Sequence, residues 1–140
     1  MGDPGSDVGV VGAQEGVDVV AMPTQARLNA HLVRWDSEIR EFDAALIAYG
    51  NRKADLEYRR AVVMETAKAG DAKVSQASAE RVADADSEAY RLHKEFRASE
   101  AMIEAKKARL RWCQAVSDAL RSEVSTERAE AQLYAGSGTT

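Results

Sequence analysis

Apolar side chains recur every three or four residues along most of the chain. In the first such stretch they fall at Leu28, Leu32, Trp35, Ile39, Phe42, Leu46 and Tyr49. The steps alternate between four and three residues, which is the spacing that keeps one stripe of a helix against a partner over many turns. The pattern predicts a helix that begins with Thr24 as its N-cap, with a kink or break expected at Gly50–Asn51.

A second seam with the same spacing runs through the C-terminal half of the chain. Its positions are Ala85, Ala89, Leu92, Phe96, Ser99, Ile103, Lys106, Leu110, Cys113, Ser117, Leu120 and Val124, and Met102, Trp112 and Val116 widen it. No segment alternates between apolar and polar residues in the manner of a strand. The predicted fold class is therefore all-α, a long helical hairpin or coiled-coil-like bundle.

The two seams are separated by signals for the end of one helix and the start of the next. The basic residue and glycine in Lys68–Gly70 indicate a helix C-terminus, and Asp71–Val74 forms the turn. Ser75 or Ser78 can then cap the next helix. Acidic residues near position 85 could restart it, giving a short helix at 76–84 and a longer one after it.

A lone hairpin buries only the face between its two helices, and the second seam is too wide for that face alone. Self-association is the simplest source of the missing contacts. We therefore expect a homo-oligomer, with its buried contacts at Trp35, Phe42, Phe96, Ile103 and Trp112.

The charge is unevenly divided along the chain. The first 22 residues contain four acidic residues and no Lys or Arg. Because the whole chain has 23 acidic and 19 basic residues, the remainder carries 19 of each and is formally neutral. The predicted organisation is a disordered tail at 1–22, whose valine pairs could alternatively dock, a helical oligomerisation and DNA-binding domain at 23–135, and a disordered end at 136–140.

The residues with reactive side chains give no pattern typical of catalysis. Cys113 is the only cysteine and lies on the apolar seam, so we expect a packed core thiol in a cytoplasmic protein. His31 and His93 lack further ligands at metal-binding spacing and are expected on helix surfaces. No catalytic residue, metal or cofactor is predicted, and the chain is not expected to be an enzyme or to cross a membrane.

One basic stretch, at 52–60, has the composition of a binding surface. Arg52 and Arg59, and likewise Lys53 and Arg60, are seven residues apart and form two basic rows on adjacent stripes of a helix. Tyr58 could stack on a base, and cations beside an aromatic ring are typical of single-strand binding. The alternative is a solvated surface with an Asp55–Arg59 pair.

A second basic run at 106–111 wraps most of a helical turn instead of forming one stripe. Glu100 and Glu104 precede it along the chain. For this run we favour the interpretation as solvated surface.

Two short segments resemble phage recombination mediator proteins of the UvsY type. One is Lys53-Ala54-Asp55-Leu56-Glu57-Tyr58, and the other is Arg111-Trp112-Cys113-Gln114-Ala115-Val116-Ser117-Asp118-Ala119-Leu120-Arg121-Ser122. In that family the basic residues of the first segment contact single-stranded DNA. The resemblance therefore implies a DNA role for Lys53. Asp55 stands where the family has its next basic residue, and Arg59 and Arg60 are expected to compensate.

The resemblance implies a closed homo-oligomeric ring that binds single-stranded DNA through Arg52, Lys53, Tyr58, Arg59 and Arg60. Its partners would be a recombinase and single-strand-binding protein, in the host cytoplasm if the chain is phage-encoded. The alternative hypothesis is a structural or adaptor coiled-coil protein, such as a phage assembly or virion component, without a nucleic-acid role. The neutral body favours this alternative, and the 52–60 stretch favours the first hypothesis.

Overall fold

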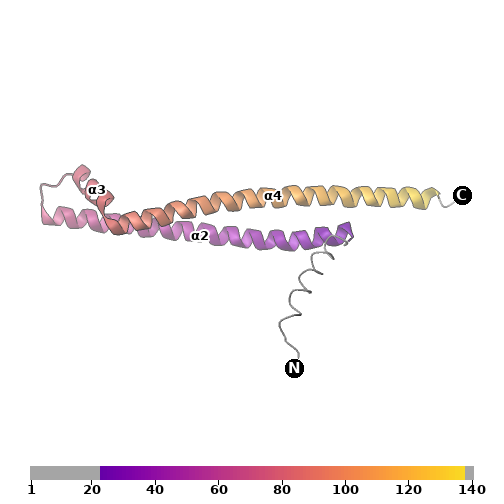
Figure 1. Ribbon diagram of the computed structural model, residues 1–140, viewed down its shortest axis with the longest axis horizontal. Coiled ribbons are helices and arrows are strands. Elements are labelled where there is room, and N and C mark those ends of the chain that lie inside the picture. The colour runs from indigo at the N-terminus through magenta and orange to yellow at the C-terminus, as the bar shows by residue number, and fades with distance from the viewer. Residues whose placement is uncertain (1–22, 138–140) are drawn as a thin grey trace, which may run out of the picture. The chain divides into compact units, whose positions relative to one another are not determined.

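The computed structural model describes residues 23–137, and all regular elements within them are helices joined by short connections (Figure 1). They are α2 (Thr24–Gly70), α3 (Gln76–Ala85) and α4 (Ser87–Ser137). The predicted all-α class is confirmed for this part of the chain. The predicted break at Gly50–Asn51 is wrong, because α2 passes through both residues. Glycine weakens a helix interior only modestly, by about 1 kcal/mol relative to alanine, and the surrounding turns offset this.

The connection between α2 and α3 follows the sequence signals closely. Helix α2 ends at Gly70, and the N-cap of α3 is Ser75, whose hydroxyl accepts a hydrogen bond from the Ser78 N–H at 3.2 Å. Lys68, in the last turn of α2, donates to the Gln76 side chain at 2.6 Å. The predicted short helix followed by a longer one is also confirmed.

Asp86 forms the joint between α3 and α4. Its N–H donates to the Ala83 carbonyl at the end of α3, and its carboxylate accepts from the Ala89 N–H at 2.9 Å in the first turn of α4. An aspartate at this position satisfies a backbone donor that a helix N-terminus leaves unpaired. One residue therefore ends one helix and starts the next.

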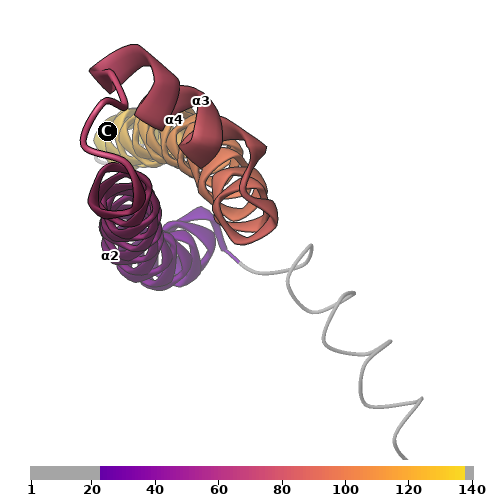
Figure 2. The ribbon, with the colours of Figure 1, turned by 90° about the vertical axis from the view of Figure 1, so that its left-hand side faces the viewer.

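The chain divides into two compact units. One is Ser37–Leu110, here called the 37–110 unit, and the other, here called the terminal unit, contains 23–36 and 111–137 of the described residues. In the 37–110 unit, α2 and α4 run antiparallel and α3 lies against them (Figure 2). In the terminal unit, the contacts of Arg27 with Glu123 and of His31 with Cys113 show the same antiparallel order.

The seam predicted for α4 is the face that this helix buries. All of its positions from Ala89 to Val124 are buried or half-buried, including the charged Lys106. Ala85, the first predicted position, belongs instead to α3 and is exposed. The 3.5-residue spacing thus correctly identified the side of α4 that faces α2.

The face that α2 turns toward α4 is rotated relative to the predicted seam. Leu28 is buried and Trp35, Phe42 and Tyr49 are half-buried, as the pattern predicts, and the half-buried Leu56 and Val63 continue this row at the same spacing. The predicted seam has a second row that includes Ile39 and Leu46. The row that is buried beside Leu28 contains Thr24, His31 and Glu38 instead. Ile39 and Leu46, here called the outer pair, are 42% and 43% exposed. A hydrophobic pattern does not select these polar side chains, whose burial depends on hydrogen bonds to groups on α4.

The two ends of the helical region extend slightly beyond their predicted bounds. The Pro23 carbonyl accepts the Arg27 N–H at 3.0 Å, and the Thr24 hydroxyl bonds to Glu127 and Glu123 on α4, so Thr24 ties two helices and is not the predicted N-cap. Helix α4 continues to Ser137, two residues past the predicted end. The predictions for 1–22 and 138–140 lie outside the described residues.

Candidate nucleic-acid interface

The two predicted basic rows lie on opposite sides of a row that faces α4. Successive residues of a helix are about 100° apart, so Leu56 lies between the row of Arg52 and Arg59 and the row of Lys53 and Arg60. Leu56 is half-buried in the 37–110 unit. The helix therefore does not present all four cations on one outward face.

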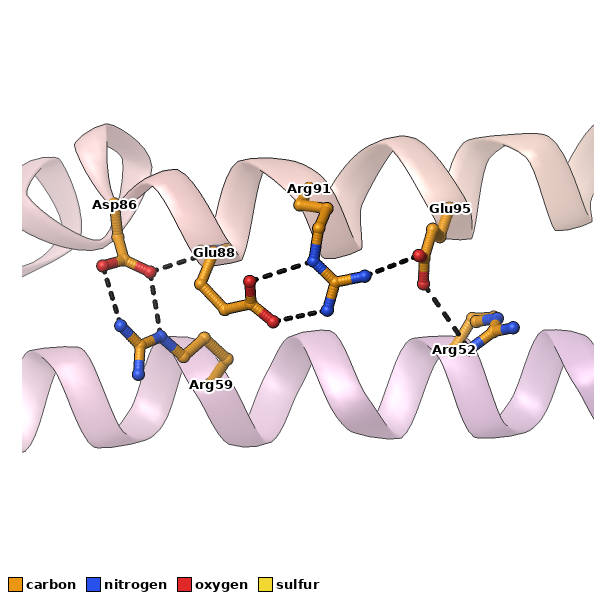
Figure 3. A network of polar contacts seen from close by, with 7 residues as sticks. Arg52, Arg59, Asp86, Glu88, Arg91 and Glu95 are labelled. Carbon is orange, nitrogen blue, oxygen red and sulfur yellow. Dashed lines mark hydrogen bonds and ion pairs between the residues drawn. The ribbon is translucent and has the colours of Figure 1, made fainter.

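Arg59 is bound by a carboxylate of its own chain. Its Nε and Nη2 donate to the two carboxylate oxygens of Asp86 at 2.9 and 3.0 Å (Figure 3). The hydrogen bond from Arg59, together with that from the Ala89 N–H, lowers the pKa of Asp86. The same contact raises the pKa of Arg59. This bidentate geometry is the one that guanidinium groups adopt with carboxylates and phosphates alike.

Arg52 belongs to a neighbouring set of charges on α4. Its Nη1 lies 3.5 Å from Glu95, which also accepts from Arg91 at 2.7 Å (Figure 3). Arg91 in turn donates to Glu88, whose pKa this hydrogen bond lowers. Three guanidinium groups thus face three carboxylates, counting Arg59 and Asp86, and the network is formally neutral.

Arg60, in the other row, is paired with α3. Its Nη1 lies 2.6 Å from the Asp84 carboxylate. The pairing of Asp55 with Arg59, considered from the sequence, is replaced by these contacts to residues more than 20 positions away. No ion pair or hydrogen bond of Lys53 occurs among residues 23–137, and this lysine is exposed.

Tyr58 is 74% exposed, but it does not share a face with Lys53. Five residues separate the two, which places them about 140° apart around the helix axis. The structure therefore brings Arg52, Arg59 and Arg60 against acidic residues of α3 and α4. It leaves Lys53 and Tyr58 on separate exposed faces of α2.

Two cations of the second basic run, Lys106 and Arg109, reach carboxylates on α2. Lys106 lies 2.6 Å from Glu41 and lowers the pKa of that carboxyl group, and Arg109 lies 3.1 Å from Glu38. Both contacts join α4 to α2 in the 37–110 unit. Arg109 is exposed, as the solvated-surface interpretation predicts, whereas Lys106 is half-buried against α2.

The residues predicted to form oligomer contacts take part in packing within the chain. Ile103 is buried, and the rings of Phe96 and Tyr49 lie 5.2 Å apart. Trp35 and Phe42 are half-buried. Among the predicted contact residues, Trp112 differs because it is 46% exposed.

His31 is buried, so its predicted position on the helix surface is wrong. Its Nε2 lies 2.8 Å from the carbonyl oxygen of Cys113, and its ring centroid lies 6.5 Å from that of Trp35 and 5.8 Å from that of Trp112. Cys113 is itself fully buried, as predicted. A histidine followed four residues later by tryptophan was the only sequence signal for this aromatic cluster. His93 is exposed, as predicted.

A groove that the sequence did not reveal lies beside this cluster in the terminal unit. Its walls include Arg27, His31 and Arg34 from α2 and Trp112, Val116 and Leu120 from α4. Its volume is about 470 Å³. We call it the Arg34–Trp112 groove. The seven-residue spacing of Arg27 and Arg34 matches that of the predicted basic rows and could have drawn attention to it.

Within residues 23–137, no three His, Cys, Asp or Glu side chains gather in a way that could hold a metal ion. None of the helices described there has the length and apolar character needed to span a membrane. Comparisons with protein-family models, with curated proteins and with solved structures find no match to this chain.

Proposed function

We propose that the chain is a single-stranded-DNA-binding recombination mediator, which helps load a recombinase onto strands covered by single-strand-binding protein. The proposal is supported by the resemblance of 53–58 and 111–122 to mediators of the UvsY type. The observation that carries it is the state of Lys53. This lysine, the one to which the resemblance gives a DNA role, is exposed and has no carboxylate partner among the described residues.

Binding by one chain would be weak, because the arginines around Lys53 already contact acidic groups. Exposed ion pairs contribute little net free energy, so a phosphate can replace the carboxylates at Arg52 and Arg60, whereas the part-buried bidentate pair of Arg59 with Asp86 is harder to replace. A ring that repeats the surface along one strand multiplies the affinity through effective concentration. Binding should fall steeply with salt, because each neutralised phosphate releases counterions.

Self-association is part of the proposal and is supported by the outer pair. Ile39 and Leu46 remain 42% and 43% exposed although they continue an apolar seam. Leu46 also borders a groove of about 450 Å³ with Tyr49 and Ile103. Covering apolar surface is favourable by about 25 cal/mol per Å². A second copy of the chain in the cytoplasm is the occupant that we propose.

The experiment is a titration of labelled oligo(dT) at about 50 mM salt, where phosphate contacts hold well, followed by anisotropy. Lys53→Ala should weaken binding and flatten its salt dependence. Lys73→Ala is the matched control, since Lys73 is also exposed and lies in the α2–α3 connection. Equal affinities for the wild type and both variants would refute the assignment of Lys53.

A structural or adaptor role, in phage assembly or a virion, is the second candidate. The observation that favours it is the pairing of Arg52, Arg59 and Arg60 with carboxylates, which leaves this stretch with little net positive charge. The two functions separate in the same titration. A wild-type protein that self-associates but does not bind oligo(dT) at about 50 mM salt would support the structural role.

A further inference from the structure

We infer that the Arg34–Trp112 groove binds one nucleotide of single-stranded DNA, with the base stacked on Trp112 and the phosphate held by arginine. The inference rests on the proposed function and assigns a binding site outside the 52–60 stretch. It concerns the terminal unit alone, which contributes every residue of the groove.

Trp112 supplies a fixed flat surface. Its indole is 46% exposed, and the His31 ring meets it in a T-shaped contact with an interplanar angle of 75°. His31 is held in turn by the Cys113 carbonyl at 2.8 Å. The indole therefore contacts a buried residue while nearly half of Trp112 stays exposed to solvent. A supported and exposed ring is the arrangement on which bases of any sequence stack.

The groove also offers guanidinium donors that the chain leaves unused. Arg34 is exposed, and residues 23–137 provide it with no ion pair or hydrogen bond. Arg27 Nη2 donates to Glu123 at 2.9 Å and to Thr24 at 3.2 Å, but its Nε is buried without an acceptor. Arg34 is therefore the donor that a phosphate in the groove can reach without displacing a carboxylate, in contrast to Arg59, which is already bound by Asp86.

An exposed aromatic ring and an arginine in the same groove favour a nucleotide over an acidic peptide as the ligand. Each nucleotide carries a flat ring and a phosphate within one residue, which matches one exposed indole beside one unpartnered guanidinium in one open groove. A peptide would have to bring the ring and the anion on different side chains. Val116 and Leu120 complete an apolar wall without adding hydrogen-bonding groups that could read a base edge, so little sequence preference is expected.

Tryptophan emission separates this site from the 52–60 stretch. In a Trp35→Phe background, Trp112 is the only tryptophan, and oligo(dT) should quench its emission as the anisotropy of the labelled oligonucleotide rises. Arg34→Ala and Trp112→Leu should each weaken binding at least about fivefold, and Trp112→Phe should retain most of it because a ring remains. Arg121→Ala, which removes an exposed arginine elsewhere on α4, should have little effect.

The outcomes distinguish this inference from the proposed function. If oligo(dT) binds without quenching Trp112, and Arg34→Ala binds as well as the wild type, the groove inference is overturned while DNA binding stands. If the wild type does not bind oligo(dT) at all, both are overturned. Stronger quenching by a Tyr-containing acidic peptide than by oligo(dT) would overturn the nucleotide assignment in favour of a protein ligand. Circular dichroism of each variant verifies that the helices are retained.

Discussion

His31 Nε2 on α2 lies 2.8 Å from the backbone carbonyl oxygen of Cys113 on α4. A carbonyl oxygen can only accept, so the imidazole donates through Nε2. Because His31 is buried between the rings of Trp35 and Trp112, this hydrogen bond and the aromatic packing act at the same point of the terminal unit. A residue that was expected on the helix surface thus joins two helices.

Replacement of His31 by alanine should destabilise the protein by about 1–3 kcal/mol, since it removes a buried donor and the packing of its ring. Urea unfolding followed by circular dichroism measures the change. His93→Ala is the control, because His93 is exposed, and its effect should stay within about 0.5 kcal/mol. Equal losses for the two variants would contradict the structural role of His31.

Ser117→Ala should leave stability unchanged or raise it by up to about 1 kcal/mol. The Ser117 side chain is fully buried and its hydroxyl has no hydrogen-bond partner, so its removal relieves a desolvation cost. Ser99→Ala provides the comparison, because the Ser99 hydroxyl donates to the Phe96 carbonyl at 2.6 Å. Urea midpoints should rank Ser117→Ala above Ser99→Ala, and the reverse order would disprove the interpretation.

The carboxylate of Asp86 should contribute to stability in a pH-dependent way. Its pKa is lowered by Arg59 and by the Ala89 N–H, so the folded state favours the charged form. The contribution is complete above the unfolded pKa of about 3.9 and is lost as the pH falls through the lower folded value. Asp86→Asn should therefore lower the melting temperature at pH 7 and have a shrinking effect between about pH 4 and pH 2. A pH-independent difference would contradict this assignment.

Substitution of the outer pair should weaken self-association without unfolding the chain. Ile39→Ser with Leu46→Ser removes exposed apolar surface on one edge of α2. Light scattering should show smaller particles, and circular dichroism should show unchanged helix content. Ile47→Ser is a stringent control, since Ile47 is 67% exposed but lies about 100° around the helix from Leu46. The proposal that the chain self-associates through the outer pair fails if Ile47→Ser dissociates the assembly as effectively as the double variant.

If the proposed function holds, Asp84→Asn should strengthen oligo(dT) binding. The substitution releases Arg60 from its 2.6 Å ion pair and should steepen the dependence of log affinity on log salt by up to about one. Asp43→Asn makes the same change in net charge at an exposed site on α2 and should have a much smaller effect. Similar gains from both variants would indicate a general charge effect and not a local site.

The sequence predicted the helices better than it predicted their pairing. A 3.5-residue apolar spacing depends only on which side of a helix is buried, and on α4 that side was identified correctly. On α2 the buried face contains His31 and Glu38, which no hydrophobic pattern selects. Their partners, the Cys113 carbonyl and Arg109, lie 82 and 71 positions away, so their burial could be recognised only from the folded arrangement.

The basic stretch shows the same limit for the candidate site. The seven-residue spacing correctly predicted that Arg52 lies on the same stripe of the helix as Arg59, and Lys53 on the same stripe as Arg60. This prediction follows from the helical repeat alone. It could not reveal that Asp84 and Asp86 would reach Arg60 and Arg59 from the junction of α3 and α4. Which cations remain unpartnered depends on contacts between helices.

The antiparallel contacts of the 37–110 unit also suggest how this unit folds. Measured in residues along the chain, its polar contacts between elements join positions separated by 8, 24, 27, 43, 65 and 71. The contact between the nearest positions closes the shortest loop and therefore costs the least entropy. Each later contact joins positions that the previous contact has already brought close together. The helices of this unit can therefore pair progressively outward from the Asp71–Val74 turn. Amide hydrogens near Glu38 should exchange with solvent sooner than those near Arg59, because the last contacts to close are the first to open.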